Sequence, residues 1–578
     1  MSAGAGPPTP ADSTRDARSA PALAFLGAAS ITLWIVATLV AVGFGWLLRI
    51  PFGPWALVIG ALIQVAYIVW IARRTGTSAR LATIAVLGVW ALAAVMTIAI
   101  AQFPDTTTDG RHYQGESVRA IASGWNPIWD PPIPDRPQTP NTYTNSYAKG
   151  VWAPEAIVLR LTNDIEATKV VPLLIAIGAL LAAFAAFSKI GVPMIPSTLI
   201  AVGLAANPIA TSQVTSHMVD GAIGSAMLLT IALTILALAD TRLRLIILPA
   251  LAASIVLLVN IKLTAPPLSA IVVGAACLTA VLLRVRGSRL VLAVASIAAT
   301  FGVVFVGANP YLTNTLRHGN PFYPAIGGHR DLLGNYIVGA MVGRPSPVRA
   351  LISISSQSGR TPLPKVPFSI SMKEISIFKV GQPAFGGLGP LFSGALVMTL
   401  IAAIIFIVTR RRVHTRPAMA WVTFAAACGT VISVLVNPAS FVARFAPELW
   451  LVVGLVAAVC FIPGEQRSLR MIGAVCCAIL LVNAALVAAP SLAGQYLKGK
   501  TQQTSLRNLA ESGPWTAEFT TWPIADIHML RENGVSFVRV TEVQCDSPMV
   551  FTVDGRLLQP STGRGSGVLL CPAKPHDR

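Results

Sequence analysis

Residues 81–101 read LATIAVLGVWALAAVMTIAIA and contain no charged side chain. A bilayer core about 30 Å thick is crossed by about 20 helical residues. In lipid, every backbone N–H and C=O must find its partner inside the segment or in a closed barrel. Because the run is long and does not alternate polar with apolar residues, it predicts a membrane-spanning helix and not a barrel strand.

Similar runs recur along the whole chain. We place spans at roughly 22–48, 52–72, 81–101, 169–187, 192–208, 219–239, 245–261, 263–283, 290–308, 389–409, 417–436, 446–462 and 471–489. The composition agrees, because 54% of the residues are hydrophobic and only 12% are charged, against about 25% charged in soluble proteins. The sequence therefore predicts an all-α polytopic membrane protein with about 13 transmembrane helices.

Basic residues are distributed unevenly between alternate gaps of this pattern. One set of gaps holds Arg73, Arg74, Arg80, Lys189, Arg242, Arg244, Arg284, Arg286, Arg289, Arg410, Arg411, Arg412, Arg416, Arg467 and Arg470. The short gaps of the other set hold the single cations Arg49, Lys262 and Arg444. Since loops rich in Lys and Arg stay in the cytoplasm, we predict a multi-pass protein of the cell membrane with a cytoplasmic N-terminus and an extracytoplasmic C-terminus.

This orientation places both long gaps, 102–168 and 309–388, on the outer face together with the tail after Pro490. The cytoplasmic gaps are too short for a nucleotide-binding domain, and the sequence has no GxxxxGK[ST] motif. The net charge of +19 is of the sign that nucleic-acid binding requires, but much of it lies in the gaps that orient the helices. We expect neither ATP hydrolysis nor a nucleic-acid partner.

The chain divides into three predicted regions. Residues 1–20 are rich in Ala, Pro, Ser and Gly, and are predicted to form a disordered cytoplasmic N-terminus. Residues 21–489 form the transmembrane domain. Residues 490–578 have a mixed polar pattern that predicts a small extracytoplasmic α/β module.

Within the module, PIADIHMLRENG predicts a helix that ends at Gly534. VSFVRV and MVFTV predict strands, and Asp554-Gly555 predicts a hairpin turn. Cys545 and Cys571 lie on the outer side, where disulfides persist, and we predict a bridge between them. The module either contacts an acceptor or stabilises the outer face.

The first outer loop contains PDTTTDGRHYQGESVRAIASGWNPIWD, directly after the span 81–101. Asp105 fits either a turn or N-cap residue or a catalytic carboxylate. Asp109 is the better catalytic candidate, because it stands beside Arg111, His112 and Tyr113 in a group that suits a polar pocket. Residues 116–123 predict a short helix stopped by Gly124.

Further polar residues lie at the outer ends of later spans. His217 and Asp220 begin the span 219–239, where a carboxylate either complements the helix dipole or serves a function. Lys262 in NIKLTAPP and Arg444 in NPASFVARFAPELW are either snorkelling side chains or phosphate ligands.

The second outer loop opens with GANPYLTNTLRHGNPFYPAIGGH. Its polar side chains form a hydrogen-bonding array suited to sugar hydroxyls: Asn309, Tyr311, Asn314, Arg317, His318, Asn320 and Tyr323. The later GQPAFGGLGPLFSGA lacks the strand–helix context of a nucleotide fingerprint. No HExxH motif occurs, and Mg²⁺ or Mn²⁺ bound through Asp109 and Asp220 is conceivable, so no cofactor is predicted with certainty.

Several of these segments together resemble the GT-C superfamily of membrane glycosyltransferases, and more narrowly bacterial relatives of the dolichyl-phosphate-mannose protein mannosyltransferases. The resemblance covers roughly residues 80–450 and is carried by TDGRHY, NSYAKGVW, DIEATK, QVTSHMVDG, NIKLT, NPYLTN, GNPFYP and GGLGPLF. Several family members place two adjacent acids in the first loop, whereas Asp105 and Asp109 are four positions apart. The identity of the base therefore stays open between them.

The resemblance implies a polyprenyl-phosphate-linked sugar as donor and an envelope glycan or protein as acceptor. A phosphate leaves without a proton, so one carboxylate suffices as general base and cations must hold the phosphate. Asp109 fits the first role, and Arg444, Lys262, Lys149 or Arg317 fit the second. We expect substrate contacts from His112, Tyr113, Asp220, His217, Asn309, Tyr311, Asn320 and Tyr323.

Two other classes of function remain open. A transporter or lipid-carrier flippase for envelope glycans commonly shows internal repeats and ionisable residues near mid-span, whereas the ionisable residues here gather at the outer ends of the spans. A non-catalytic scaffold for envelope assembly is the third possibility, because a fold does not fix a function.

Overall fold

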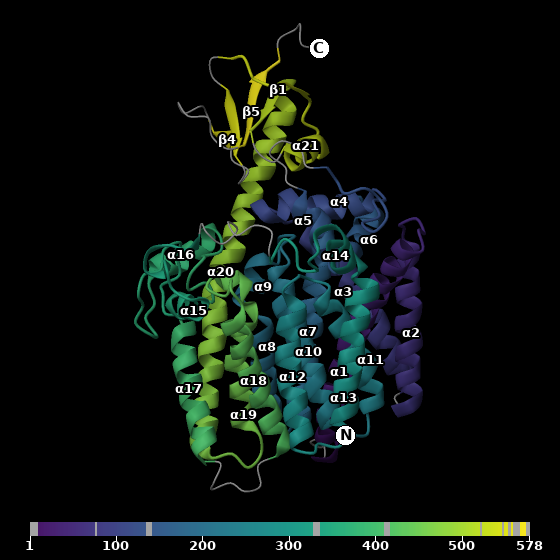
Figure 1. Ribbon diagram of the computed structural model, residues 1–578, viewed down its shortest axis with the longest axis vertical. Coiled ribbons are helices and arrows are strands. Elements are labelled where there is room, and N and C mark those ends of the chain that lie inside the picture. Colours follow the sequence, from purple (N-terminus) through teal and green to yellow (C-terminus); the bar gives the residue numbers. More distant parts are fainter. Residues whose placement is uncertain are drawn as a thin grey trace, which may run out of the picture.

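The computed structural model describes residues 10–75, 78–134, 141–326, 336–409, 417–520, 523–545, 548–552, 557–558 and 567–573. A helical bundle forms most of the molecule, and a small sheet module stands at one end of it, carried by the long helix α20 (Figure 1).

Nine helices of the described chain are long and apolar enough to cross a bilayer. They are α1 (Pro10–Leu47), α2 (Trp55–Thr75), α3 (Ala79–Ala101), α7 (Val170–Lys189), α10 (Asp220–Ala239), α12 (Ala265–Leu282), α13 (Ser288–Phe301, continued by η3, Gly302–Val306), α18 (Ala418–Val436) and α20 (Arg467–Ser512). Four shorter apolar helices complete the set: α8 (Met194–Ala205), α11 (Arg244–Val259), α17 (Phe392–Val408) and α19 (Leu451–Phe461), which follows η10 (Pro447–Trp450). The nine and the four coincide with the thirteen predicted spans, so the predicted fold class is confirmed.

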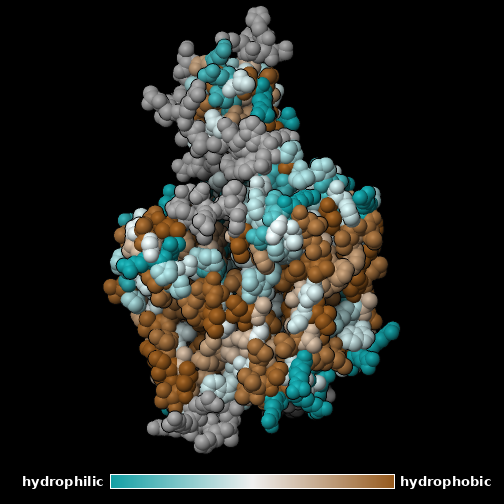
Figure 2. Space-filling model, viewed as in Figure 1, coloured by the Kyte–Doolittle hydropathy of each residue, from teal (hydrophilic) through white to brown (hydrophobic). Residues whose placement is uncertain are grey.

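Close helix packing depends on small residues. In lipid, helices associate through van der Waals contact, which small side chains permit. A Cβ on Gly60 of α2 would lie 2.2 Å from Thr38 Oγ1 of α1, and one on Gly429 of α18 would lie 2.9 Å from the Ala275 side chain of α12. The central α10 is 94% buried over its most apolar window, while Figure 2 shows a hydrophobic belt on the outside of the bundle.

Short helices from both long gaps, and from the segments after α8 and α18, gather at the end of the bundle that carries the module (Figure 1). They are η1 (Gly110–Gly115), α4 (Glu116–Ala122), α5 (Thr142–Ser146), α6 (Trp152–Thr162), η2 (Glu166–Lys169), α9 (Pro208–Gln213), η4 (Ala308–Leu312), α14 (Thr313–His318), η7 (Gly339–Met341), α15 (Ser346–Ile354), α16 (Met372–Val380) and η9 (Ala443–Phe445). Helix α4 is the predicted short helix, and Gly124 follows it with φ +106°, a conformation that favours glycine.

Two boundaries differ from those read off the sequence. Helix α1 begins at Pro10, inside the segment for which we predicted disorder, and residues 1–9 lie outside the described residues. Helix α20 does not end near residue 489 but continues through Pro490 to Ser512. Its extension packs on the outer loops, because a Cβ on Gly494 would lie 2.0 Å from the Lys379 carbonyl oxygen. The helix therefore carries the module away from the bundle.

The module is a five-stranded sheet with one helix. Its elements are β1 (Trp515–Phe519), α21 (Pro523–Glu532), β2 (Phe537–Arg539), β3 (Met549–Thr552), β4 (Leu557–Leu558) and β5 (Gly567–Pro572), and the strand order is β2-β1-β5-β3-β4. Strands β1 and β2 are parallel, and the other pairs are antiparallel. The predicted helix and two predicted strands correspond to α21, β2 and β3, while the predicted Asp554-Gly555 turn lies outside the described residues.

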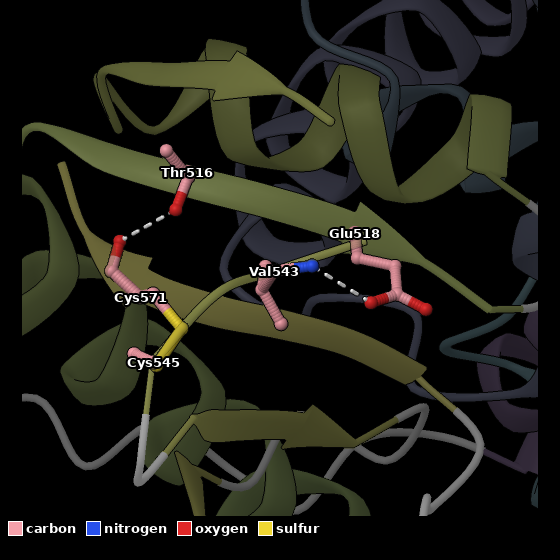
Figure 3. The surroundings of a disulfide bond; sticks show 5 residues. All are labelled: Thr516, Glu518, Val543, Cys545 and Cys571. Atoms are coloured by element: carbon pink, nitrogen blue, oxygen red, sulfur yellow. Dashed lines mark hydrogen bonds between the residues drawn. A yellow bond between two sulfur atoms is a disulfide. The ribbon is translucent and has the colours of Figure 1, made fainter. Parts of the chain in front are cut away.

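A disulfide between Cys545 and Cys571 joins the segment after β2 to β5, as predicted (Figure 3). The Thr516 hydroxyl donates to the Cys571 carbonyl at 3.3 Å. The Val543 N–H donates to the Glu518 carboxylate at 3.1 Å. These contacts fasten an irregular segment to the sheet.

Candidate functional site

Asp109 of the first outer loop meets Arg444 of the loop between α18 and α19. Arg444 Nη1 lies 2.7 Å from Asp109 Oδ2. The side chains are 21% and 37% exposed, respectively, so the pair is open to solvent and to a substrate. Asp109 occupies the position just before η1, in the segment that follows α3.

A second ion pair joins Asp220 and Lys262, whose Oδ1 and Nζ atoms lie 2.5 Å apart. The Gln213 side chain also donates to Asp220 Oδ2 at 3.2 Å. Asp220 begins α10, and Lys262 lies in the turn between α11 and α12. Both residues are less exposed than the Asp109–Arg444 pair.

Phe445 links the two pairs. Lys262 Nζ lies 4.4 Å from the centroid of its ring, and Arg444 Cζ lies 4.9 Å from it. Cations are attracted to aromatic faces at these distances. Burial alone lowers the pKa of Arg444, but Asp220 and Asp109 outweigh burial and raise that pKa, so the guanidinium stays charged. Two acids and two cations thus form one coupled cluster.

Three tyrosines lie beside this cluster. The ring centroids of Tyr113, Tyr143 and Tyr147 are 5.2 to 6.2 Å apart. Burial raises the pKa of Tyr113 and of Tyr147, and the charges of Asp109 and Asp220 raise both further. The hydroxyls therefore stay protonated at neutral pH and offer hydrogen-bond donors and aromatic faces near the two acids.

The carboxylate of Asp105 is buried and hydrogen-bonded to the protein. It accepts hydrogen bonds from the Thr107 N–H and hydroxyl at 2.8 and 2.7 Å, and from the His217 N–H at 2.8 Å. Only 1% of the residue is exposed. A Cβ on Gly110 would lie 2.1 Å from Asp105 Oδ2, so glycine is required there. Asp105 closes the turn that precedes Asp109. These contacts favour the interpretation of Asp105 as a turn residue over that of a catalytic carboxylate.

His217 is buried behind Asp105. Its Nδ1 lies 3.5 Å from the Thr168 hydroxyl. Burial lowers the pKa of His217 to about 3, although the charge of Glu166 opposes that effect. The imidazole is therefore neutral at physiological pH and packs beneath the site.

Lys149 and Arg317 form a separate group. Lys149 Nζ donates to the carbonyls of Asn145 and Tyr147 at 3.2 and 2.5 Å. It lies 5.7 and 5.8 Å from the ring centroids of Trp125 and Trp152. Burial lowers the pKa of Lys149 well below its ordinary value, and the charge of Arg317 lowers it further.

Several side chains of the array that we predicted to bind sugar, in the second outer loop, form hydrogen bonds with the backbone of the protein. Asn309 Nδ2 donates to the Pro127 and Asn145 carbonyls at 3.0 and 3.3 Å, and the Tyr311 hydroxyl donates to the Val259 carbonyl. Asn320 accepts from the Phe322 N–H at 2.9 Å. These contacts hold the outer loops together.

Two other members of the predicted substrate set also have protein contacts. The ring of Tyr323 stacks on that of His318 at a centroid distance of 3.8 Å. His112 Nε2 lies 3.8 Å from Asp526 Oδ1 in the C-terminal module. Of that set, Tyr113 and Asp220 are the residues that the contacts above place at the ion-pair cluster.

A small pocket adjoins the segment that carries Arg444. Its charged wall residue, Lys365, is neutralised by Glu374 at 2.6 Å. The walls are otherwise hydroxyl-bearing, glycine and apolar residues, including Ser440, Ala443, Ala446, Gly387, Leu388 and Phe392. The pocket is therefore an uncharged space next to Ala443 and Ala446.

Several members of the cluster were not among the predicted site residues: Phe445, Tyr143, Tyr147, Gln213 and Tyr336. Tyr147 and Gln213 lie within the segments NSYAKGVW and QVTSHMVDG, which carried the family resemblance, so those segments contained a signal. Phe445 follows Arg444 directly. Tyr336, whose hydroxyl lies 3.5 Å from Arg444 Nη2, had no distinguishing pattern around it.

The two acids of the cluster are each paired with a basic side chain. Among the described residues, no three His, Cys, Asp or Glu side chains gather where they could hold a metal ion. Asp109 and Asp220 are each paired with a cation of the protein, whereas Mg²⁺ requires near-octahedral oxygen ligands.

No protein-family model matches the chain, and no curated protein matches it. Among solved structures, the chain is similar to ArnT from Cupriavidus metallidurans bound to undecaprenyl phosphate, with 12% identity, a TM-score of 0.41, and coverage of 78% of this chain and 85% of that chain. It is also similar to the archaeal oligosaccharyltransferase AglB from Archaeoglobus fulgidus in complex with an inhibitory peptide and a dolichol-phosphate, with 14% identity, a TM-score of 0.39, and coverage of 77% and 59%.

Proposed function

We propose that this protein is a GT-C-type membrane glycosyltransferase that moves a sugar from a polyprenyl-phosphate donor to an envelope glycan or protein acceptor on the outer face of the cell membrane. The observation that carries the proposal is the meeting of Asp109, Arg444, Asp220 and Lys262, from four separate loops, in one cluster at the outer end of the bundle.

Asp109 is the proposed general base. It takes the proton of the acceptor hydroxyl while the acceptor oxygen forms its bond to the anomeric carbon of the sugar. The bond from that carbon to the donor phosphate breaks, and the phosphate keeps the electron pair. Positioned proton transfer of this kind contributes about 10²–10⁴-fold to a rate.

Arg444 and Lys262 are the proposed phosphate ligands. An incoming phosphate competes with Asp109 for the Arg444 guanidinium, whose planar donors suit phosphate oxygens. Binding of the donor would therefore free the carboxylate at the moment when a base is needed. Lys149 and Arg317 remain weaker candidates for the same role, because Lys149 already donates to two carbonyls.

The surrounding groups suit the rest of the donor. Tyr113, Tyr143 and Tyr147 offer aromatic faces and hydroxyls to a sugar ring. The polyprenyl tail approaches the phosphate from the surrounding lipid. We further propose the orientation predicted above, with the N-terminus inside and the module outside.

The experiment supplies purified protein in nanodiscs with radiolabelled polyprenyl-phosphate sugars and envelope extract. The wild-type protein should transfer label to an acceptor, and Asp109→Asn should lose transfer while inserting normally. Glu511→Gln, which removes an exposed carboxylate of α20, is the control and should behave as wild type. The same three proteins are also reconstituted in liposomes, where label that crosses the membrane without transfer, equally in all three, would instead favour the flippase alternative.

A further inference from the structure

Helix α21 of the C-terminal module packs against the turn of chain that follows Asp109. Arg111 Nη2 lies 2.6 Å from Asp526 Oδ1, and the two side chains are 8% and 2% exposed. Arg111 Nη2 also lies 3.3 Å from the Met529 sulfur, and His112 Nε2 lies 3.8 Å from the same Asp526 oxygen. A buried ion pair therefore joins the first outer loop to a domain more than 400 positions away in the chain.

Partly exposed polar contacts surround this buried pair. His528 Nδ1 lies 3.0 Å from Glu116 Oε1, and the Arg119 guanidinium donates to both carboxylate oxygens of Glu532. Solvent-exposed pairs contribute little energy each. The buried Arg111–Asp526 pair is therefore the contact in this interface that we expect to contribute most to its specificity.

Residues in and beside the π-helix η1 contact both the ion-pair cluster and the module. Asp109, just before it, and Tyr113, within it, belong to the ion-pair cluster, while Arg111 and His112 reach the module. Fixing Arg111 therefore fixes the direction in which Asp109 points. Misplacement of a catalytic group by about 1 Å is enough to slow a reaction by about 10²-fold.

Helix α20, which carries the module, contacts the same region independently. A Cβ on Gly499 would lie 2.9 Å from Pro104, at the start of the first outer loop. Gln495 Nε2 donates to the Ser212 carbonyl at 2.5 Å, in the segment that leads to Asp220. The module is thus anchored beside both acids.

We propose that Asp526 is a positioning residue, which acts through Arg111 to hold the Asp109 carboxylate in place opposite Arg444, and that the module is a structural part of the site. The consequence for catalysis rests on the proposed function, whereas the effect on the order of the loop does not. Asp526→Asn removes the charge with little change of shape. Glu532→Gln, in the exposed pair of the same interface, is the matched control.

Hydrogen exchange of the full-length protein in nanodiscs tests the positioning without any substrate. In Asp526→Asn, the amides of residues 105–116 should exchange roughly tenfold faster, as expected when a local opening becomes easier, while those of β1 and β5 stay unchanged. Glu532→Gln should change these rates by less than about twofold. Unchanged exchange of 105–116 in Asp526→Asn would overturn the proposal.

A double variant separates positioning from misfolding. Asp526→Leu alone leaves Arg111 buried without its carboxylate, whereas Arg111→Met with Asp526→Leu replaces the pair by apolar groups, a change that is often neutral. The double variant should restore slow exchange of residues 105–116, and failure to do so while β1 and β5 remain protected would contradict the proposal. A second outcome would also contradict the proposal. If β1 and β5 lose protection in Asp526→Leu and the double variant does not restore it, the pair serves the stability of the module.

Measurements of kcat and KM for sugar transfer then test the effect on catalysis. Asp526→Asn should lower kcat by about 10²-fold with the KM for the donor little changed. A rise in the KM for the acceptor with kcat intact would show that the module is an acceptor-binding domain and would overturn positioning. If the wild-type protein transfers no sugar, the proposed function fails, and the exchange data still decide whether Asp526 orders the loop.

Discussion

The guanidinium of Arg444 lies 2.7 Å from the carboxylate of Asp109, although the two residues are 335 positions apart in the chain. The same guanidinium also interacts with Asp220. Arg444 therefore stands between acids supplied by two different loops, and a phosphate that enters the site must compete with both for it.

Arg444→Lys should weaken the use of the donor. Lysine keeps the charge but lacks the planar fork that engages two phosphate oxygens. We expect kcat/KM for the donor to fall by roughly 10²–10³-fold, the usual effect of removing a donor from a transition-state charge. Steady-state rates at varied donor concentration measure this. Arg507→Lys, at an exposed pair on α20, is the control, and equal rates for both variants would rule out Arg444 as a ligand.

Asp105→Asn should affect stability more than chemistry. The Asp105 carboxylate accepts three hydrogen bonds while buried, and loss of such a partner costs about 1–3 kcal/mol. Thermal unfolding in detergent should show a lower midpoint, while folded molecules keep most of their transfer rate. A variant with normal stability and no transfer would instead make Asp105 the base.

Stability should depend on pH through His217. Its pKa is about 3 in the folded protein, against about 6.5 in an unfolded chain. Between these values the unfolded state binds the extra proton, so stability is greatest above pH 6.5 and falls as the pH drops toward 3. This amounts to about 2 kcal/mol between pH 7 and pH 5.

His217→Gln removes this titration and should reduce the difference in unfolding midpoint between pH 7 and pH 5. The carboxylates of the protein supply a background that is common to both proteins. Identical pH dependence of the variant and the wild-type protein would show that His217 has the same pKa in the folded and unfolded states.

Chelation tests the role of a divalent cation. Because Asp109 and Asp220 are each paired with a protein cation, we expect transfer to continue at the same rate after treatment with EDTA. Loss of transfer that Mg²⁺ or Mn²⁺ restores would show that a metal ion displaces Arg444 or Lys262 from these carboxylates during the reaction.

The sequence predicted the helical framework well, because the requirement to cross a bilayer fixes both the length and the apolarity of each span. Asp220 was a candidate because ionisable residues at the ends of spans are costly unless they have a use, and Asp109 was a candidate because polar residues surround it in the sequence. Their pairing with Lys262 and Arg444 was not predicted in detail, because partners from different loops are brought together only by the packing of the bundle.

Other features could not be read from local patterns. Asn309 and Tyr311 have side chains that suit sugar hydroxyls, but the same donors also bind backbone carbonyls, and the sequence does not distinguish these uses. Asp526 lies in an ordinary amphipathic helix, and its partner Arg111 is supplied by a distant loop. The continuation of α20 through Pro490 was missed because a proline usually marks the end of a helix.

The most direct test of the account is a single turnover of donor that is already bound to the enzyme. Asp109→Asn and the wild-type protein are loaded with radiolabelled polyprenyl-phosphate sugar, the bound label is counted, and acceptor is then added. The account predicts that Asp109→Asn binds the donor at least as well as the wild-type protein but transfers it at least about 10²-fold more slowly, as expected for loss of a general base. Transfer of the bound sugar at the wild-type rate would contradict it.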